Sequence, residues 1–167
     1  FRRLLAFFIF ASRAAAKAKE IEADLVYAIS TPLTIAFPAV VASRQKAVPM
    51  VFEVGDLWPT VPIAMGVLRN STIIKLALRL EKWAYSNASA IVALSPQMRQ
   101  GIESVGVPAS LIATIPNACD FDVFGHSDEA ANSFLESRPH LIGRPFILYP
   151  GTFGDVNGLD YAILLAE

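Results

Sequence analysis

Two carboxylates and an indole lie close together in the segment 53–59, which reads EVGDLWP. Glu53 ends an otherwise apolar run, and Asp56 and Trp58 follow it. Carboxylates accept hydrogen bonds from hydroxyl groups, and an indole covers apolar C–H surface such as the face of a sugar ring. These three side chains are therefore a candidate carbohydrate site. The alternative is that Asp56 caps the following segment and Trp58 belongs to the core.

A second candidate lies near the end of the sequence, where Gly151, Thr152 and Gly154 follow a short apolar run. A glycine-bearing turn between a strand and a helix lets backbone N–H groups approach a diphosphate. The segment matches neither the dinucleotide fingerprint GxGxxG nor the phosphate-loop lysine motif. We therefore interpret it as a diphosphate loop without such a signature.

Metal chemistry has one weak candidate, because Asp120 and Asp122 have the spacing of paired metal-binding carboxylates. The pair lies in a polar stretch and not directly after a sheet strand, so we expect Asp120 to cap a turn, with no metal bound and no cofactor. His126 and His140 stand alone, without a second ligand at metal-binding spacing, and we expect both to be exposed. The single cysteine, Cys119, fits a reducing compartment, which predicts a cytoplasmic protein.

The elements that position these residues follow from apolar patterning. Short runs rich in Val, Ile and Phe alternate with helical stretches, which predicts an α/β fold: a Rossmann-like, doubly wound parallel sheet covered on both faces. The expected strands are residues 24–29, 50–54, 90–94 and 112–115. The expected helices are residues 1–22, 33–44, 73–87 and 96–104.

Ligands of such a sheet bind where the strands end, because helix N-termini and loop amides meet at that edge. The candidate residues of segment 53–59 stand at one such exit, and Asn117 stands at another. Ser95, followed by Pro96, predicts an N-cap with proline at the first helical position. We expect Ser30 and Thr31, after the first of these strands, to be caps as well.

The polar segment from Asn117 to Pro145 interrupts this alternation. A strand at 146–149 and a helix beginning near Gly158 then restart it. We therefore predict an N-terminal domain over residues 1–124, a linker over 125–145, and the start of a second domain over 146–167. The sequence is expected to be a piece of a longer protein that lacks the first strand of the N-terminal domain.

The formal net charge of −1 gives no reason to expect nucleic acid as a partner. Basic residues nevertheless crowd into the first helix, where Phe8, Ala11 and Ala15 share a face opposite Arg13 and Lys17. The basic face of residues 1–20 could rest on anionic lipid headgroups, as a peripheral contact with the inner face of a membrane. The alternative is an ordinary helix packed on the sheet.

Four segments together resemble the family 4 glycosyltransferases, and most closely the bacterial subgroup that builds surface polysaccharides on a lipid carrier. They are EVGDLWP (53–59), ALSPQMRQGIESVGVP (93–108), IPNACDFDVF (115–124) and YPGTFGDVNGLD (149–160). The resemblance implies a GT-B architecture, in which one Rossmann-like domain faces the acceptor and the other binds a nucleotide-sugar. It also implies a retaining transfer to a lipid-linked saccharide without a bound metal.

Carried onto this sequence, the resemblance places Glu53 and Asp56 on the acceptor side, and Gly151, Thr152 and Gly154 against the donor diphosphate. It places Asn117 and Asp120 in the linker, and it identifies no catalytic base in these residues. Two positions depart from the family pattern, Gly55 where arginine is usual and Ala118 where glycine is usual. The loss of a guanidinium keeps one alternative open, an inactive binding or membrane-scaffold module. A nucleotide-sugar epimerase, which shares the architecture, is another alternative, but it would require further carboxylates and histidines at the strand exits.

Overall fold

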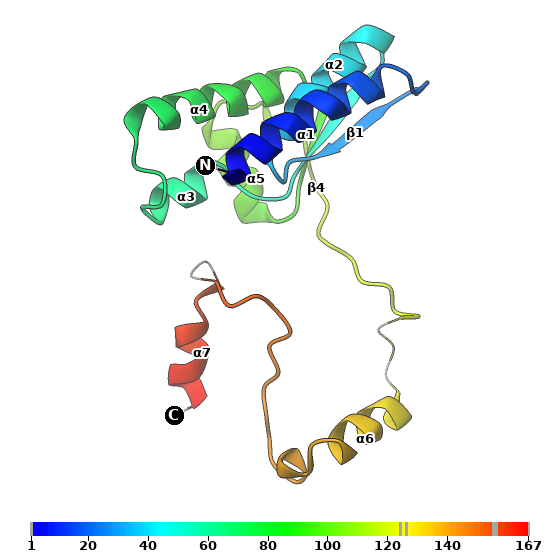
Figure 1. Cartoon of the computed structure of the whole chain (residues 1–167), viewed down its shortest axis with the longest axis vertical. Coiled ribbons are helices and arrows are strands. Elements are labelled where there is room, and N and C mark those ends of the chain that lie inside the picture. The colour runs from blue at the N-terminus through cyan, green and yellow to red at the C-terminus, as the bar shows by residue number, and fades with distance from the viewer. Residues whose placement is uncertain (1, 124, 126, 155–156, 167) are drawn as a thin grey trace. The chain divides into compact units, whose positions relative to one another are not determined.

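The computed structural model describes residues 2–123, 125, 127–154 and 157–166. The chain divides into two compact units, Phe1–Asn117 and Ala118–Glu167 (Figure 1), and each is described by itself. The domain limits inferred from the sequence, at 124 and 145, stay a prediction.

Unit 1 contains a parallel sheet whose strands lie in the order β1-β2-β3-β4. Each strand was expected from its apolar run, and the structure places all of them within two residues of the expected limits. The strands are β1 (Val26–Ile29), β2 (Met50–Val54), β3 (Ala90–Ala93) and β4 (Ile112–Thr114). The predicted α/β, Rossmann-like fold class is confirmed.

Two helices of unit 1 begin at residues whose side chains cap them. The Ser95 side chain accepts a hydrogen bond from the backbone N–H of Met98 at 3.1 Å, with Pro96 as the first helical residue, which confirms the predicted N-cap. Asn70 caps another helix in the same manner. The helical elements are α1 (Arg2–Ala18), η1 (Leu33–Ile35), α2 (Ala36–Lys46), α3 (Thr60–Ala64), α4 (Ser71–Ser86), α5 (Pro96–Ser104) and η2 (Ala109–Leu111). The short α3 was not predicted, because five residues carry too little periodicity to be recognised.

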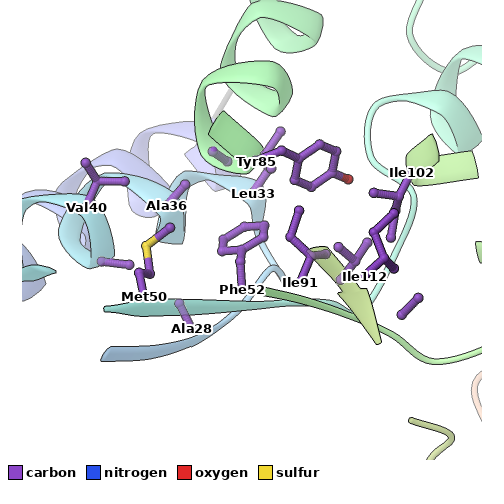
Figure 2. Close-up of a cluster of buried hydrophobic side chains, with 14 residues drawn as sticks. Ala28, Leu33, Ala36, Val40, Met50, Phe52, Tyr85, Ile91, Ile102 and Ile112 are labelled. Atoms are coloured by element: carbon purple, nitrogen blue, oxygen red, sulfur yellow. The ribbon is translucent and has the colours of Figure 1, made fainter. Parts of the chain in front are cut away.

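The core lies between the sheet and the helices. Ala28, Phe52, Ile91 and Ile112 pair in register across the four strands, and their side chains form one buried row (Figure 2). Each strand lies next to the one that precedes it in the sequence, so the sheet grows in one direction from β1 to β4. Because crossovers between parallel strands are right-handed, all the connections then lie on the same side of the sheet. The core is therefore concentrated on that side.

The opposite face of the sheet is more open. Leu25, Tyr27 and Ile29 alternate with the buried Ala28 along the edge of the sheet, and each of the three is about half exposed. The sequence pattern predicts cover on both faces of the strands. In the part of unit 1 that the structure describes, no helix covers β1 on this second face, and its side chains are exposed to solvent.

The first helix packs through small side chains. Ala11 and Ala15 are buried and α1 lies against α2, whereas Arg13 and Lys17 are exposed on the other side, as the pattern predicted. Phe8 was expected on the buried face but is 59% exposed. The helix contacts its neighbour through alanines, so this larger ring at its N-terminal end remains outside the contact. No helix within residues 2–123, 127–154 and 157–166 has the length and apolar character needed to cross a bilayer.

Unit 2 contains α6 (Asp128–Glu136), η3 (Pro139–Leu141) and α7 (Leu159–Ala166). The helix expected near Gly158 is confirmed by α7, whereas α6 arises in the stretch for which no element was predicted. The strand expected at 146–149 does not form, and Ile147 is 85% exposed. A strand requires a neighbour to satisfy its backbone groups, and the described residues of unit 2 contain no second strand.

Candidate ligand pocket at the carboxyl edge of the sheet

A pocket of about 230 Å³ opens where β1 and β2 end. Loops after both strands form its walls, and one residue each of α1 and α4 completes it. We call it the β1–β2 pocket. Its lining residues are Phe7, Ser30, Thr31, Pro32, Leu33, Thr34, Asp56, Trp58 and Leu80.

The structure brings Asp56 and Trp58 together in the lining of this pocket. Asp56 is exposed, and its backbone carbonyl accepts a hydrogen bond from the N–H of Trp58 at 2.8 Å. The Asp56 side chain does not cap α3, whose N-cap is Pro59 without a side-chain bond. Trp58 is partly buried and packs against the core while it lines the pocket. Trp58 therefore fits both interpretations of the sequence: its indole is part of the core, and it is also available to a ligand in the pocket.

Ser30 joins the two walls of the pocket. It is only 3% exposed, and its Oγ accepts a hydrogen bond from the backbone N–H of Gly55 at 3.1 Å. The expectation that Ser30 and Thr31 are helix caps is wrong, because η1 begins after Pro32 and has no side-chain cap bond. A Cβ atom at Gly55 would lie 2.6 Å from Thr31 Oγ1, so the two loops approach each other closely.

Glu53 lies apart from this group. Strand alternation directs it to the face opposite Phe52 and Val54, where it accepts a hydrogen bond from the Tyr27 hydroxyl. This bond, together with partial burial and the nearby negative charge, raises the pKa of Tyr27. Glu53 is not among the residues that line the β1–β2 pocket.

A second acid, which the sequence reasoning missed, is buried in α4. Glu81 is 1% exposed, and its Oε1 accepts a hydrogen bond from Tyr85 Oη at 3.2 Å. Its Oε2 has no partner among the described residues. Desolvation raises the pKa of Glu81, and burial together with the neighbouring carboxylate raises that of Tyr85. The helical spacing of Glu81 with the buried Ala77, Ala84 and Tyr85 is the sequence signal that could have found it.

The structure places the predicted linker residues on the surface. Asn117 is exposed at the end of unit 1. Asp120 Oδ1 accepts a hydrogen bond from the backbone N–H of Asp122 at 2.9 Å, which confirms the predicted turn cap. His140 is exposed, as expected, whereas His126 lies outside the described residues. The part of the chain that the structure describes contains no group of three or more side chains able to hold a metal ion.

The predicted diphosphate loop lies in unit 2. Asn157 braces it, because its side-chain amide donates to the Thr152 carbonyl at 2.8 Å and its backbone N–H donates to the Gly154 carbonyl at 2.9 Å. Gly151 and Thr152 are exposed, and Gly154 is partly exposed. The loop therefore presents accessible backbone, and the residues 155–156 within it lie outside the described ranges.

Two pocket residues could not have been inferred from local sequence. Phe7 comes from α1 and Leu80 from α4, and both reach the strand exits only through tertiary packing. Ser30 and Thr31 did carry a signal, since they directly follow a strand at the edge where ligands bind, but they were assigned as caps.

Comparison with known proteins supports this architecture. Residues 1–118 match the family described as glycosyl transferase 4-like domain. The fold is similar to that of Anabaena Alr3699/HepE in crystal structures with UDP and glucose and with UDP-glucose, each at a TM-score of 0.54 and 22% sequence identity. A third structure of that protein, in complex with UDP, has a TM-score of 0.53 and 20% identity. Each match covers 76% of this chain and 31% of the other. None of the curated protein sequences matches the chain.

Proposed function

This chain belongs to the glycosyl transferase 4-like family, and from that premise we propose that it forms the acceptor side of a retaining glycosyltransferase. In this proposal unit 1 binds a saccharide acceptor, and the described part of unit 2 opens the domain that binds a nucleotide-sugar. The chain spans 31% of the length of the HepE structures it resembles, and the open sheet edge at Tyr27 and Ile29 offers apolar surface to further polypeptide. Both observations support a longer enzyme.

The observation that carries the proposal is the β1–β2 pocket. It lies at the carboxyl edge of a parallel sheet, where ligands of this architecture bind. Asp56 offers acceptor oxygens to sugar hydroxyls, and Trp58 offers an aromatic surface to the C–H face of a ring. A saccharide needs both kinds of contact, and the two residues line one pocket.

The loop of Gly151, Thr152 and Gly154 supports a donor site. Accessible backbone N–H groups can stabilise a diphosphate, on which charge develops as the bond to the sugar breaks. In the proposed reaction the bond between the sugar C1 and the diphosphate breaks, and the acceptor oxygen forms a new bond to C1 on the same face. The acceptor proton passes to the departing diphosphate, so the step requires no protein base, and we propose that it requires no bound metal.

The first helix supports a lipid-linked acceptor at a membrane surface, in the synthesis of a cell-surface polysaccharide. Its outward side combines exposed Ile9 and Phe10 with exposed Arg13 and Lys17. Apolar side chains enter the headgroup region, and each nearby cation contributes about 1 kcal/mol at an anionic surface. Phe7, on the same helix, lines the β1–β2 pocket. A membrane surface at α1 would therefore deliver the acceptor close to the pocket.

Transfer of radiolabelled sugar from nucleotide-sugars into lipid extracts tests the proposal, with the full-length protein as enzyme. We expect lipid-linked product, and a reduction of about 100-fold in kcat/KM with Asp56→Ala, because positioning contacts commonly contribute that much. Asp24→Asn, which alters an exposed carboxylate before β1, serves as the control. Absence of product with every nucleotide-sugar would contradict the proposal.

One observation favours a second candidate, an inactive scaffold that kept the fold. The loops at Gly55 and Thr31 are packed so closely that a larger residue at 55 requires Thr31 to move. The arginine that the family usually carries at position 55 is absent, and Thr31 fills the space beside this position. Binding of the full-length protein to anionic vesicles, with no transfer and no donor hydrolysis, would support the scaffold instead.

A further inference from the structure

The β1–β2 pocket has a distinct charge character. Among its nine described lining residues, Asp56 is the only acidic one, and neither lysine nor arginine is present. A bound phosphate or sugar carboxylate would therefore meet a negative charge that no described lining residue offsets with a cation. The pocket favours neutral ligands.

Ser30 gives the pocket a donor. Its hydroxyl is buried, and its Oγ already accepts the hydrogen bond from Gly55. A serine hydroxyl has one proton and two lone pairs, so the Ser30 proton is left to donate to a ligand oxygen. The carboxylate of Asp56 can only accept. A ligand that both accepts and donates through neighbouring hydroxyl groups satisfies both residues.

Apart from the hydroxyl groups of Thr31 and Thr34, the remaining lining is apolar. Thr34 Oγ1 is buried and has no partner among the described residues, so it is a further hydroxyl that a ligand could satisfy. Leu33 and Trp58 pack against the core, and Phe7 and Leu80 close the sides. These surfaces suit the C–H face of a pyranose ring, whereas a fully ionised group in contact with them would lose hydration without compensation.

On the premise of the proposed function, we propose that this pocket selects an uncharged sugar as the terminal residue of the acceptor, with Asp56 as the residue that rejects uronic acids and phosphosugars. Ser30 donates to one ring hydroxyl, Asp56 accepts from another, and Trp58 lies along the apolar face. A like charge about 4 Å from a carboxylate near a protein surface weakens binding by roughly tenfold or more. Asp56 therefore discriminates in two ways: its carboxylate accepts a hydrogen bond from a neutral sugar, and its charge repels an anionic one.

The test compares two lipid-linked acceptors that differ only in their terminal residue, glucose or glucuronic acid. With the full-length enzyme, kcat/KM for the glucose acceptor should exceed that for the glucuronate acceptor by about tenfold or more. Asp56→Asn should lower kcat/KM for glucose and remove most of the difference between the two. Asp24→Asn, the matched exposed carboxylate before β1, should preserve the wild-type ratio.

The outcomes separate the two proposals. Transfer to both acceptors with equal efficiency, a preference for glucuronate, or a preference that survives in Asp56→Asn would overturn the inference while leaving the transferase intact. Transfer to neither acceptor, together with no product in lipid extracts, would refute the proposed function itself. Saturation-transfer NMR on the 167-residue chain gives a measurement that is independent of turnover and of any variant: methyl glucoside should give signals and methyl glucuronide should not, and the reverse result would also overturn the inference.

Discussion

The backbone N–H of Gly55 donates a hydrogen bond to Ser30 Oγ over 3.1 Å, which ties the loop after β2 to the loop after β1. Both loops supply walls of the β1–β2 pocket. At the same contact, a Cβ atom added to Gly55 would lie 2.6 Å from Thr31 Oγ1. The pocket therefore depends on a close contact between two segments that lie far apart in the sequence.

Ser30→Ala removes the acceptor of that bond and leaves the amide of Gly55 without its protein partner. We expect the free energy of unfolding of the chain to fall by about 1 kcal/mol, the usual net worth of one hydrogen bond. Urea denaturation measures the change. Ser104→Ala, which removes an exposed helical hydroxyl, should change stability by less than about 0.5 kcal/mol. Equal effects of the two variants would show that the bond carries no stability.

Gly55→Ala introduces a methyl group against Thr31 Oγ1, and we expect it to destabilise the chain by about 1–3 kcal/mol through overpacking. Thr31→Ala removes the obstructing oxygen, so the double variant should recover most of the loss. A double-mutant cycle measured by urea denaturation gives the coupling energy directly. Additive effects of the two substitutions would contradict the close contact.

Glu81→Gln should stabilise the chain at neutral pH. Burial raises the pKa of Glu81 above its ordinary value of 4.5, so the folded state holds the proton more tightly than the unfolded state. The stability that the tighter binding of this proton contributes is fully present below pH 4.5, and it is lost as the pH rises through the pKa of Glu81 in the folded state. Glutamine resembles the protonated acid, so the variant should be more stable by about 1–3 kcal/mol at neutral pH and similar to wild type in acid.

Thermal unfolding across that pH range measures this difference, with Glu22→Gln as a control at an exposed acid. A constant difference between Glu81→Gln and wild type at all pH values would show that the Glu81 carboxylate does not titrate differently on folding.

Glu53→Gln should lower the pKa of Tyr27. The hydrogen bond to Glu53 is the largest cause of the raised pKa, and the negative charge adds to it. Without that charge the phenol should ionise closer to its ordinary value of 10.0. Tyrosinate absorbance follows the titration, and subtraction of the Tyr27→Phe curve isolates Tyr27 from the other three tyrosines. An unchanged titration would contradict the pairing.

The strands and main helices of unit 1 were predictable because their signals are local. Met50–Val54 is apolar except for Glu53, and Ser95-Pro96 is a helix start that needs no distant partner. The strand at 146–149 was wrongly predicted for the converse reason. Its apolar residues satisfy the local pattern, but a strand exists only when another strand supplies its hydrogen bonds.

The sequence by itself determined the family, the parallel sheet, and the edge where Asp56 and Trp58 stand, because each depends on residue order and short-range periodicity. Only the tertiary structure decided the composition of the pocket. Pairing of β1 with β2 brought Glu53 to the Tyr27 hydroxyl, and helix packing brought Phe7 and Leu80 to the strand exits. These placements depend on contacts between segments far apart in the chain, and such contacts have no signature in the local sequence.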